Sequence, residues 1–441
     1  MKQSQTLPAR STSKGKHVLT AGMILLLASA QTALANSAPV VSNVTASQRT
    51  DGSKKVDVGY NLADADGDAC VVTVQASNDG GATWTVPITA VTGHVGSGIT
   101  PGTGKLIVWD CPVDLPGAFG SQYQVRVCAA DAPTGMVPIH AGQFQMGNSF
   151  DPSEGYSHEL PQHWVYVDAF YMDKYQVTNQ QYAEALNWAR NQGGHITVTD
   201  NIVYQAGSGT SYPYCSTTRS SSYSRITWNG TNFGVVNGYE NHPMEYVSWY
   251  GAVAFANWRS AMQGKPLCYN LSTWACNFSA GGYRLPTEAE WEKAARGGAA
   301  GRRFPWSDSD YIQHARANYF SYWSGGAPYY SYDTSPTQGY HPTFIAVSPY
   351  TSPVGYFAPN GYGLYDMTGN VFEWCNDRYS STYYSSSPYN NPRGPTSGTD
   401  RVLRGGCWGR SVHTCRVASR GYSTPDFWYL YFGFRLALGT E

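Results

Sequence analysis

The chain has 441 residues, which exceeds the length of a typical single domain and predicts two domains. Only 13% of the residues are charged and the formal net charge is -1, which gives no electrostatic basis for binding nucleic acid or an anionic membrane. Aromatic residues make up 14% of the chain, and there are 34 Tyr, 14 Trp and 47 Gly. This composition is typical of a loop-rich globular protein and excludes a mainly disordered one.

The first 35 residues have the pattern of a signal peptide. Basic residues that include Lys2 and Arg10 precede an apolar stretch at 18–30, and Ala33–Ala35 matches a cleavage site. The apolar stretch is shorter than the roughly 20 residues that a membrane-spanning helix needs. An uncleaved membrane anchor is the alternative. We expect the mature chain to begin near Asn36, to lack a transmembrane segment, and to be secreted, periplasmic or held at the cell surface.

Nine cysteines fit an oxidising compartment, although the sequence does not fix their pairing. They are Cys70, Cys111, Cys128, Cys215, Cys268, Cys276, Cys375, Cys407 and Cys415. Because no Cys-x-x-Cys occurs, a zinc ribbon or a thioredoxin-like site has no support.

Residues 36–133 predict a small all-β domain. Val56–Tyr60 and Tyr123–Val127 alternate in polarity, Val71–Gln75 is rich in β-branched residues, and turn-forming residues separate these runs. The pattern favours a β-sandwich, and the segment resembles fibronectin-type or immunoglobulin-like modules. The acidic stretch Asp64–Asp68 fits either a calcium loop or a solvated turn. No Glu follows at the twelfth loop position, so we favour the turn.

Beyond this domain, residues 134–441 predict three helices in a background of loops and strands. The first helix begins at Thr178, where Gln181 completes a capping box. The second begins near Ser248. The third is capped by Thr287 and Glu290, so helix capping accounts for the acidic residue at its start.

Seven segments of this region, taken in order and spacing, resemble the formylglycine-generating-enzyme (sulfatase-modifying-factor) family. They are Met136–Ile139 with Gly142–Gly147, Tyr175–Asn179, Pro243–Trp249, Arg284–Glu292, Gly361–Trp374, Arg404–Trp408 and Gly433–Arg435. Gln176 stands where Glu is usual in the family. The resemblance implies an α+β fold, an irregular C-type-lectin-like domain, which here follows the small all-β sandwich domain.

The resemblance also implies structural calcium. The family's ligand positions match Asp366, Gly369, Val371 and Glu373, and a second site is half matched by Asn318 and the carbonyl of Tyr319. Side-chain carboxylates and backbone carbonyls make an oxygen-only set, which calcium prefers. The alternative is that Asp366 and Glu373 only bond to the backbone of a buried turn.

The family's enzymes use O2 and copper(I), held by two cysteine thiolates, to oxidise a sulfatase cysteine to formylglycine. Here the matching loop is shorter. Cys407 replaces the family's serine, Cys415 lies beside the Arg-x-Ala-x-Arg tail, and Phe372 replaces a tryptophan of the oxygen pocket. Cys407 and Cys415 are therefore weak catalytic candidates. A structural disulfide between them is the favoured interpretation, and a relocated copper site is the alternative.

Residues 408–432 are rich in side chains that make good binding hot spots. The candidate ligand face comprises Trp408, Arg410, His413, Arg420, Tyr422, Phe427, Trp428, Tyr429 and Tyr431. The segment resembles the variable face of diversity-generating-retroelement target proteins, which share the fold. The alternative is that these aromatic residues pack in the core.

We therefore expect an exported, non-catalytic binding or structural module whose lectin-like face binds an unknown protein or glycan. The alternative is a formylglycine-generating oxidase with a rebuilt copper site, and a third hypothesis is a self-assembling surface component. Copper-dependent O2 consumption with a Cys-x-Pro-x-Arg peptide separates the first two hypotheses.

Overall fold

A computed structural model describes residues 38–439, apart from positions 66, 68, 69, 85, 87, 118–121, 132, 152 and 193. The expected signal peptide at 1–35 and the side chains of Asp66 and Asp68 lie outside the described residues. Among the helices that the structure describes, none is long and apolar enough to cross a membrane.

The N-terminal part of the chain forms two sheets that share one core. The first sheet has the order β1 (Val40–Gln48), β2 (Val56–Ala63), β6 (Gly102–Trp109) and β4 (Val91–Gly93), and the second has the order β5 (Gly96–Ile99), β3 (Cys70–Ser77) and β7 (Gln124–Asp131). Alternate residues such as Val58, Tyr60 and Val72 point inward, as the period of two requires. A short helix, α1 (Cys111–Asp114), follows β6. The likeness to fibronectin-type or immunoglobulin-like modules stays a prediction.

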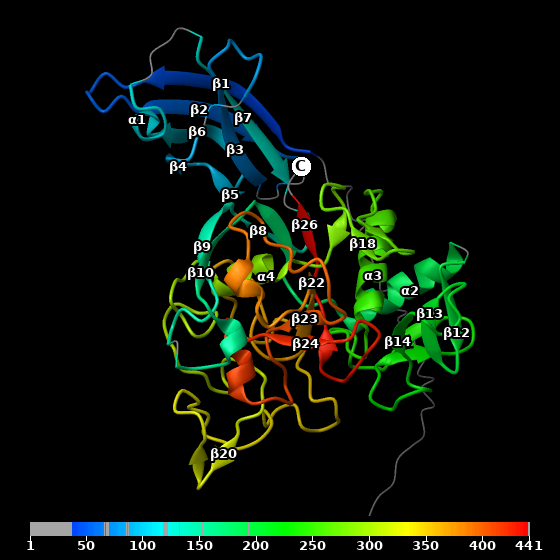
Figure 1. Cartoon of the computed structure of the whole chain (residues 1–441). Helices are drawn as coiled ribbons and strands as arrows, with labels where there is room; N and C mark the ends of the chain where they lie inside the picture. Colours follow the sequence, from blue (N-terminus) through cyan, green and yellow to red (C-terminus); the bar gives the residue numbers. More distant parts are fainter. Residues whose placement is uncertain are drawn as a thin grey trace, which may run out of the picture.

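The C-terminal part is mostly strands and loops with few helices (Figure 1). One four-stranded sheet has the order β19 (Tyr283–Arg284), β26 (Ala437–Gly439), β11 (Phe170–Asp173) and β8 (Met136–Ile139). A second has the order β24 (Gly421–Ser423), β23 (Arg401–Arg404), β22 (Phe372–Arg378) and β25 (Phe432–Gly433). The last strand, β26, therefore lies in the same sheet as β8, the first strand of this part of the chain. Figure 1 shows β26 close to the N-terminal sheets.

The remaining strands form small antiparallel sheets. These are β9 (Gly142–Met146) with β10 (His163–Val167); β12 (Ile196–Thr199) with β13 (Ile202–Gln205) and β14 (Pro213–Ser216); β15 (Ile226–Trp228) with β16 (Phe233–Val235); β17 (Tyr269–Asn270) with β18 (Ala275–Cys276); and β20 (Trp323–Ser324) with β21 (Ala327–Pro328). Short strands of this kind leave much of the backbone in loops, so the loops carry most of the surface.

The three expected helices form, with caps where the sequence predicts them. They are α2 (Asn179–Asn191), α3 (Trp249–Met262) and α4 (Glu288–Arg296). The Thr178 hydroxyl accepts from the Gln181 amide at 3.2 Å, and the Thr287 hydroxyl accepts from the Glu290 amide at 3.1 Å. In both boxes the side chain of the third residue bonds back to the cap's own amide, so the predicted capping boxes are confirmed.

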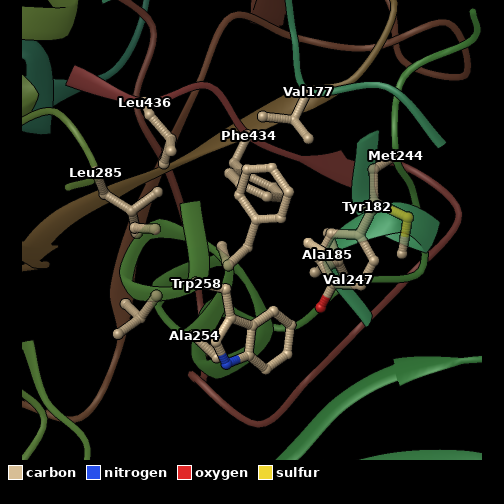
Figure 2. Packing of buried hydrophobic residues seen from close by; sticks show 14 of the residues in the cluster. Val177, Tyr182, Ala185, Met244, Val247, Ala254, Trp258, Leu285, Phe434 and Leu436 are labelled. Atoms are coloured by element: carbon tan, nitrogen blue, oxygen red, sulfur yellow. The ribbon is translucent and has the colours of Figure 1, made fainter. Parts of the chain in front are cut away.

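The main core lies where α2 and α3 meet the C-terminal segment (Figure 2). Tyr182 of α2 stacks on Phe255 of α3 with ring centroids 5.5 Å apart, and Phe434 packs edge-on against Phe255 at 5.3 Å. Figure 2 shows Trp258 and Leu436 completing the same cluster. Burying each such side chain contributes roughly 1.5–3 kcal/mol, so this cluster anchors the last segment of the chain.

Candidate functional site: cysteine pair, cation positions and aromatic loop

The two candidate cysteines lie side by side beneath the surface. Gly406, in the left-handed region at φ 74°, brings Cys407 and Cys415 together, and a Cβ at Gly406 would lie 2.6 Å from the Sγ of Cys415. Both side chains are fully buried. Cys407 and Cys415 are both free thiols, so the expected disulfide between them is not present.

Burial makes this pair a poor source of thiolate. It raises the pKa of Cys415 to about 12 and raises the pKa of Cys407 well above its usual value. The thiolate is the nucleophile, so burial disfavours the reactive form of both sulfurs at neutral pH in the metal-free protein. Phe372, the third departure from the family, packs against Phe432 with ring centroids 6.4 Å apart.

The expected cation ligands around Glu373 converge, but a side-chain amide occupies their centre. The Nε2 atom of Gln176 lies 2.9 Å from Glu373 Oε1, 3.3 Å from the Val371 carbonyl oxygen and 3.4 Å from the Asp366 carbonyl oxygen. Gln176 is 1% exposed, and its Oε1 accepts from the Asn370 amide at 3.1 Å. An N–H donor thus stands where these oxygens would hold a cation.

Glu373 has further partners that fix it in place. Arg435 donates to it through Nε and Nη2, each at 2.7 Å, and Trp291 Nε1 donates to Oε2 at 2.7 Å. Asp366 turns its carboxylate away, with Oδ2 accepting from the Gly355 amide at 2.6 Å. The residues present therefore do not offer an open position for calcium, because the ion would have to displace the Gln176 amide. Calcium here stays a prediction.

Near the second expected cation position, a carboxylate bonds to the hydroxyl of Tyr319 and not to its carbonyl. The Tyr319 hydroxyl donates to Asp333 at 2.6 Å, and the Ser321 hydroxyl and the Ser335 amide also donate to Asp333. The Tyr319 carbonyl lies 3.2 Å from His314 Nε2. Asn318 Oδ1 is buried with no hydrogen-bond partner among the described residues. Calcium at this second position stays a prediction.

Among the described residues, three ligand-type side chains gather in the N-terminal sheets. The oxygens of Asp64 and Asp131 and the sulfur of Cys70 lie within 4.8 Å of one another. Cys70 Sγ is 3.8 Å from each carboxylate, and the carboxylates raise the pKa of its thiol further after burial has raised it. The thiol is therefore protonated and serves as a weak donor to the two carboxylates.

The expected ligand face divides into buried and exposed residues. Trp408 is 2% exposed and Arg420 is 4% exposed, so neither belongs to a face. Arg420 makes a two-bond ion pair with Glu288 at 2.7 and 2.8 Å, and Trp408 Nε1 donates to the Leu430 carbonyl at 3.2 Å. The sequence placed both on the candidate ligand face, with core packing as the alternative for the aromatic residues, and these distant partners hold both in the core.

The residues that remain accessible gather mainly on the loop at 424–431, which we call the aromatic loop. Phe427 and Tyr429 are exposed and stack with centroids 5.9 Å apart, and Tyr431 lies 5.1 Å from Tyr429. Arg410 is exposed and its guanidinium lies 5.7 Å from the Tyr431 ring. Trp428 is half-buried on the same loop.

Two residues of the expected face lie apart from this loop. Tyr422 is exposed and stacks on Tyr379 at 4.1 Å. His413 is half-buried and bonds to the hydroxyls of Tyr156 and Tyr330 at 3.1 and 3.0 Å. The aromatic loop and Arg410 are therefore the part of the expected face that could contact a partner.

A matched pair of substitutions separates this face from the core. We expect Tyr429→Ala, at a side chain that is 38% exposed, to change the free energy of unfolding by less than about 0.5 kcal/mol. Trp408→Ala should cost about 3–5 kcal/mol, because it empties a site packed against the rings of Tyr350 and Tyr431. Urea unfolding of both variants measures the difference. Similar losses of unfolding free energy would contradict the division of the expected face into exposed and buried residues.

A half-buried histidine near the start of α2 predicts a dependence of stability on pH. Burial, aided by the charge of Arg225, lowers the pKa of His242 to about 4, and its Nδ1 lies 2.8 Å from the Thr351 hydroxyl. The pKa of His242 in the folded protein lies below its unfolded value of about 6.5. The neutral histidine's contribution to the free energy of unfolding is therefore fully present above pH 6.5 and is lost as the pH falls towards 4.

Allowing for partial solvent screening, protonation of His242 should lower the free energy of unfolding by about 2 kcal/mol. His242→Gln should flatten the fall in unfolding free energy between pH 6.5 and 4, whereas His195→Gln, at an exposed histidine, should not. Urea unfolding across this pH range tests the expectation, and parallel curves for all three proteins would refute it.

A mostly β domain with few helices, a buried arginine–glutamate core and a C-terminal surface loop is consistent with a C-type-lectin-like fold of the formylglycine-generating-enzyme type. Residues 124–439 match the model of the sulfatase-modifying factor enzyme 1-like domain, which is well over half of the chain. The chain belongs to this family.

The chain resembles relatives that are named as formylglycine-generating enzymes and a relative that is named as inactive. It is 34% identical over 318 residues to the formylglycine-generating enzyme of Streptomyces coelicolor, which covers 69% of this chain and 88% of the relative. It is 30% identical over 319 residues to the inactive C-alpha-formylglycine-generating enzyme 2 of Bos taurus, covering 69% and 88% respectively. Among solved structures, Treponema denticola variable protein 1 is 25% identical, with a TM-score of 0.45 and coverage of 69% of this chain and 95% of that one.

Proposed function

We propose that this protein is an exported, non-catalytic binding module of the sulfatase-modifying-factor family, which contacts its partner through the aromatic loop and Arg410. The observation that carries the proposal is the burial of Cys407 and Cys415. Neither side chain is exposed, and burial raises the pKa of both thiols, so in the metal-free protein this pair is protonated and out of reach of a substrate cysteine.

The aromatic loop supports the binding role. Tyr and Arg supply large contact areas and hydrogen bonds, and they are enriched among the residues that dominate binding energy. Phe427, Tyr429 and Arg410 reach the surface without being needed for the core. The relative from Bos taurus that is named inactive shows that the family includes proteins without the catalytic activity.

The oxidase remains the second candidate, because relatives named formylglycine-generating enzyme share about a third of their sequence with this chain. The test incubates the purified mature protein with copper(I), O2 and a Cys-x-Pro-x-Arg peptide, and follows O2 consumption and the peptide's mass. The Streptomyces coelicolor enzyme serves as the positive control.

We expect no O2 consumption above the protein-free background and no formylglycine product. Formation of product that requires copper and is lost in Cys415→Ser would overturn the proposal and establish the oxidase. Product that survives both Cys407→Ser and Cys415→Ser would also overturn it, and would place the chemistry elsewhere in the chain.

A further inference from the structure

A cavity opens beside the aromatic loop, between parts of the chain that are distant in sequence. Its volume is ≈ 430 Å³, and Tyr250 of α3, Trp274, Arg378, Arg401, Thr424 and Asp426 are among the residues that line it. The aromatic loop supplies Thr424 and Asp426, and the Tyr250 amide donates to the Pro425 carbonyl at 3.4 Å. The cavity thus adjoins the surface that the proposed function uses.

Aromatic rings form one wall of this cavity. The Tyr250 and Trp274 centroids are 4.4 Å apart, and Tyr212 lies within 5.1 Å of both rings. Trp274 sits in the turn between β17 and β18 at φ 61°, in the left-handed region that bulky residues rarely adopt. The backbone of a tryptophan held in this conformation is strained, and strain of this kind concentrates at ligand sites.

The charged part of the cavity is unusual for this protein. Every buried arginine among the described residues lies within 4.0 Å of a carboxylate: Arg225, Arg284, Arg296, Arg303, Arg404, Arg416, Arg420 and Arg435. Arg401 and Arg378 are half-buried, and in the described part of the chain neither makes an ion pair. Arg401 Nη1 donates to the Asn376 carbonyl at 2.6 Å, while its Nε is buried without a partner there.

The two guanidinium groups are also close enough to repel each other. Burial lowers the pKa of Arg401 to about 10, and the neighbouring charge of Arg378 lowers it further. A bound anion would relieve this repulsion and supply the missing partner. Asp426 is exposed at the rim and opposes an anion, but it contributes one negative charge against two positive charges.

We propose that this cavity binds an acidic sugar. The carboxylate or sulfate group of the sugar pairs with Arg401 and Arg378, and the apolar face of its ring lies on Tyr250 and Trp274, whose π faces attract C–H groups. Hydroxyl groups of the sugar meet a rim that carries the side chains of Ser211, Thr273, Thr399 and Thr424. An acidic peptide would use the arginines but not the flat wall and the hydroxyl rim. The assignment deepens the proposed binding function and rests on it.

The experiment titrates four probes into the mature protein by isothermal calorimetry. They are tetragalacturonate, a sulfated maltotetraose, neutral maltotetraose and tetraglutamate. We expect one or both acidic sugars to bind at least tenfold more tightly than neutral maltotetraose and tetraglutamate. The preferred acidic sugar identifies the carboxylate or the sulfate as the group recognised. Its affinity should fall with added salt, because the pairing is electrostatic.

Three variants locate the binding. Arg378→Ala and Arg401→Lys should each weaken binding of the acidic sugar at least tenfold, which corresponds to a loss of about 1.4 kcal/mol of binding free energy. Arg393→Ala removes an exposed arginine that lies 4.0 Å over Phe278 outside this cavity, and it should leave the affinity unchanged. Thermal unfolding checks that each variant is folded. If Arg401→Lys unfolds, Arg378→Ala decides, because Arg378 is more peripheral to the aromatic core.

Each of the following results would overturn the assignment: no binding of either acidic sugar at millimolar concentration, equal affinity for maltotetraose, tighter binding of tetraglutamate, or equal weakening by Arg393→Ala. These outcomes are separate from those of the oxidase test. If the protein oxidises the peptide and also binds the acidic sugar through Arg378, the non-catalytic proposal is wrong but the assignment of the cavity as an acidic-sugar site stands.

Discussion

Replacing Arg404 with Met is expected to lower the free energy of unfolding by about 3–5 kcal/mol. Arg404 is fully buried and donates to Glu292 Oε2 at 2.5 Å and to Glu288 Oε1 at 3.3 Å. Met fills a similar volume without charge, so it leaves Glu292 with one arginine, Arg296, instead of two. Urea unfolding at pH 7 measures the loss.

The control for Arg404 is a surface pair. Arg316 binds Asp308 at 2.5 Å, and the Asp308 side chain is 62% exposed. Arg316→Met should cost less than about 1 kcal/mol, because water solvates the partner that is left behind. Adding Glu292→Gln to Arg404→Met should deepen the loss, because Glu292 is also the carboxylate partner of the buried Arg296. A loss below 1 kcal/mol for Arg404→Met would mean that the network contributes little.

Replacing Gln176 with Glu should make the stability of this protein depend on calcium. In a chelating buffer at pH 7.5 we expect a loss of about 3 kcal/mol, because a second buried carboxylate would face Glu373 where the amide now donates at 2.9 Å. Calcium should restore about 2.7 kcal/mol at a concentration one hundred times its dissociation constant. Its ligands would include the carbonyls of Asp366 and Val371.

The Gln176 measurement compares thermal and urea unfolding with and without calcium in both proteins. Gln143→Glu, at an exposed position of β9, is the matched control and should show no added response. Any response of the unchanged protein, for instance from the position near Asn318, cancels in the comparison. An identical calcium response in the unchanged protein and in Gln176→Glu would show that the amide does not occupy a cation position.

Local features of the fold were predictable because their partners lie close in sequence. The caps at Thr178 and Thr287 need only a residue three positions later, and both capping boxes are present. The family also followed from the sequence, because short motifs with fixed order and spacing survive where the rest of the chain diverges. Residues 124–439 match the family model.

The candidate site was less predictable because its chemistry depends on long-range contacts. The sequence predicted that the family's catalytic cysteine pair is displaced, and it favoured a disulfide where the structure has two buried thiols. It showed Gln176 in place of Glu, but not that the amide nitrogen would meet Glu373, 197 residues away. The cavity beside the aromatic loop was not foreseen at all, since no motif marks Arg378 or Arg401.

By itself, the sequence determined the family and the helix caps, which depend on residue identity at short spacing. Only the tertiary structure decided which polar and aromatic residues are buried. Arg420 looks like a surface residue beside Tyr422, yet it pairs with Glu288, 132 residues earlier. The physical reason is that a buried charge needs a partner, and which partner it meets depends on how distant segments fold together.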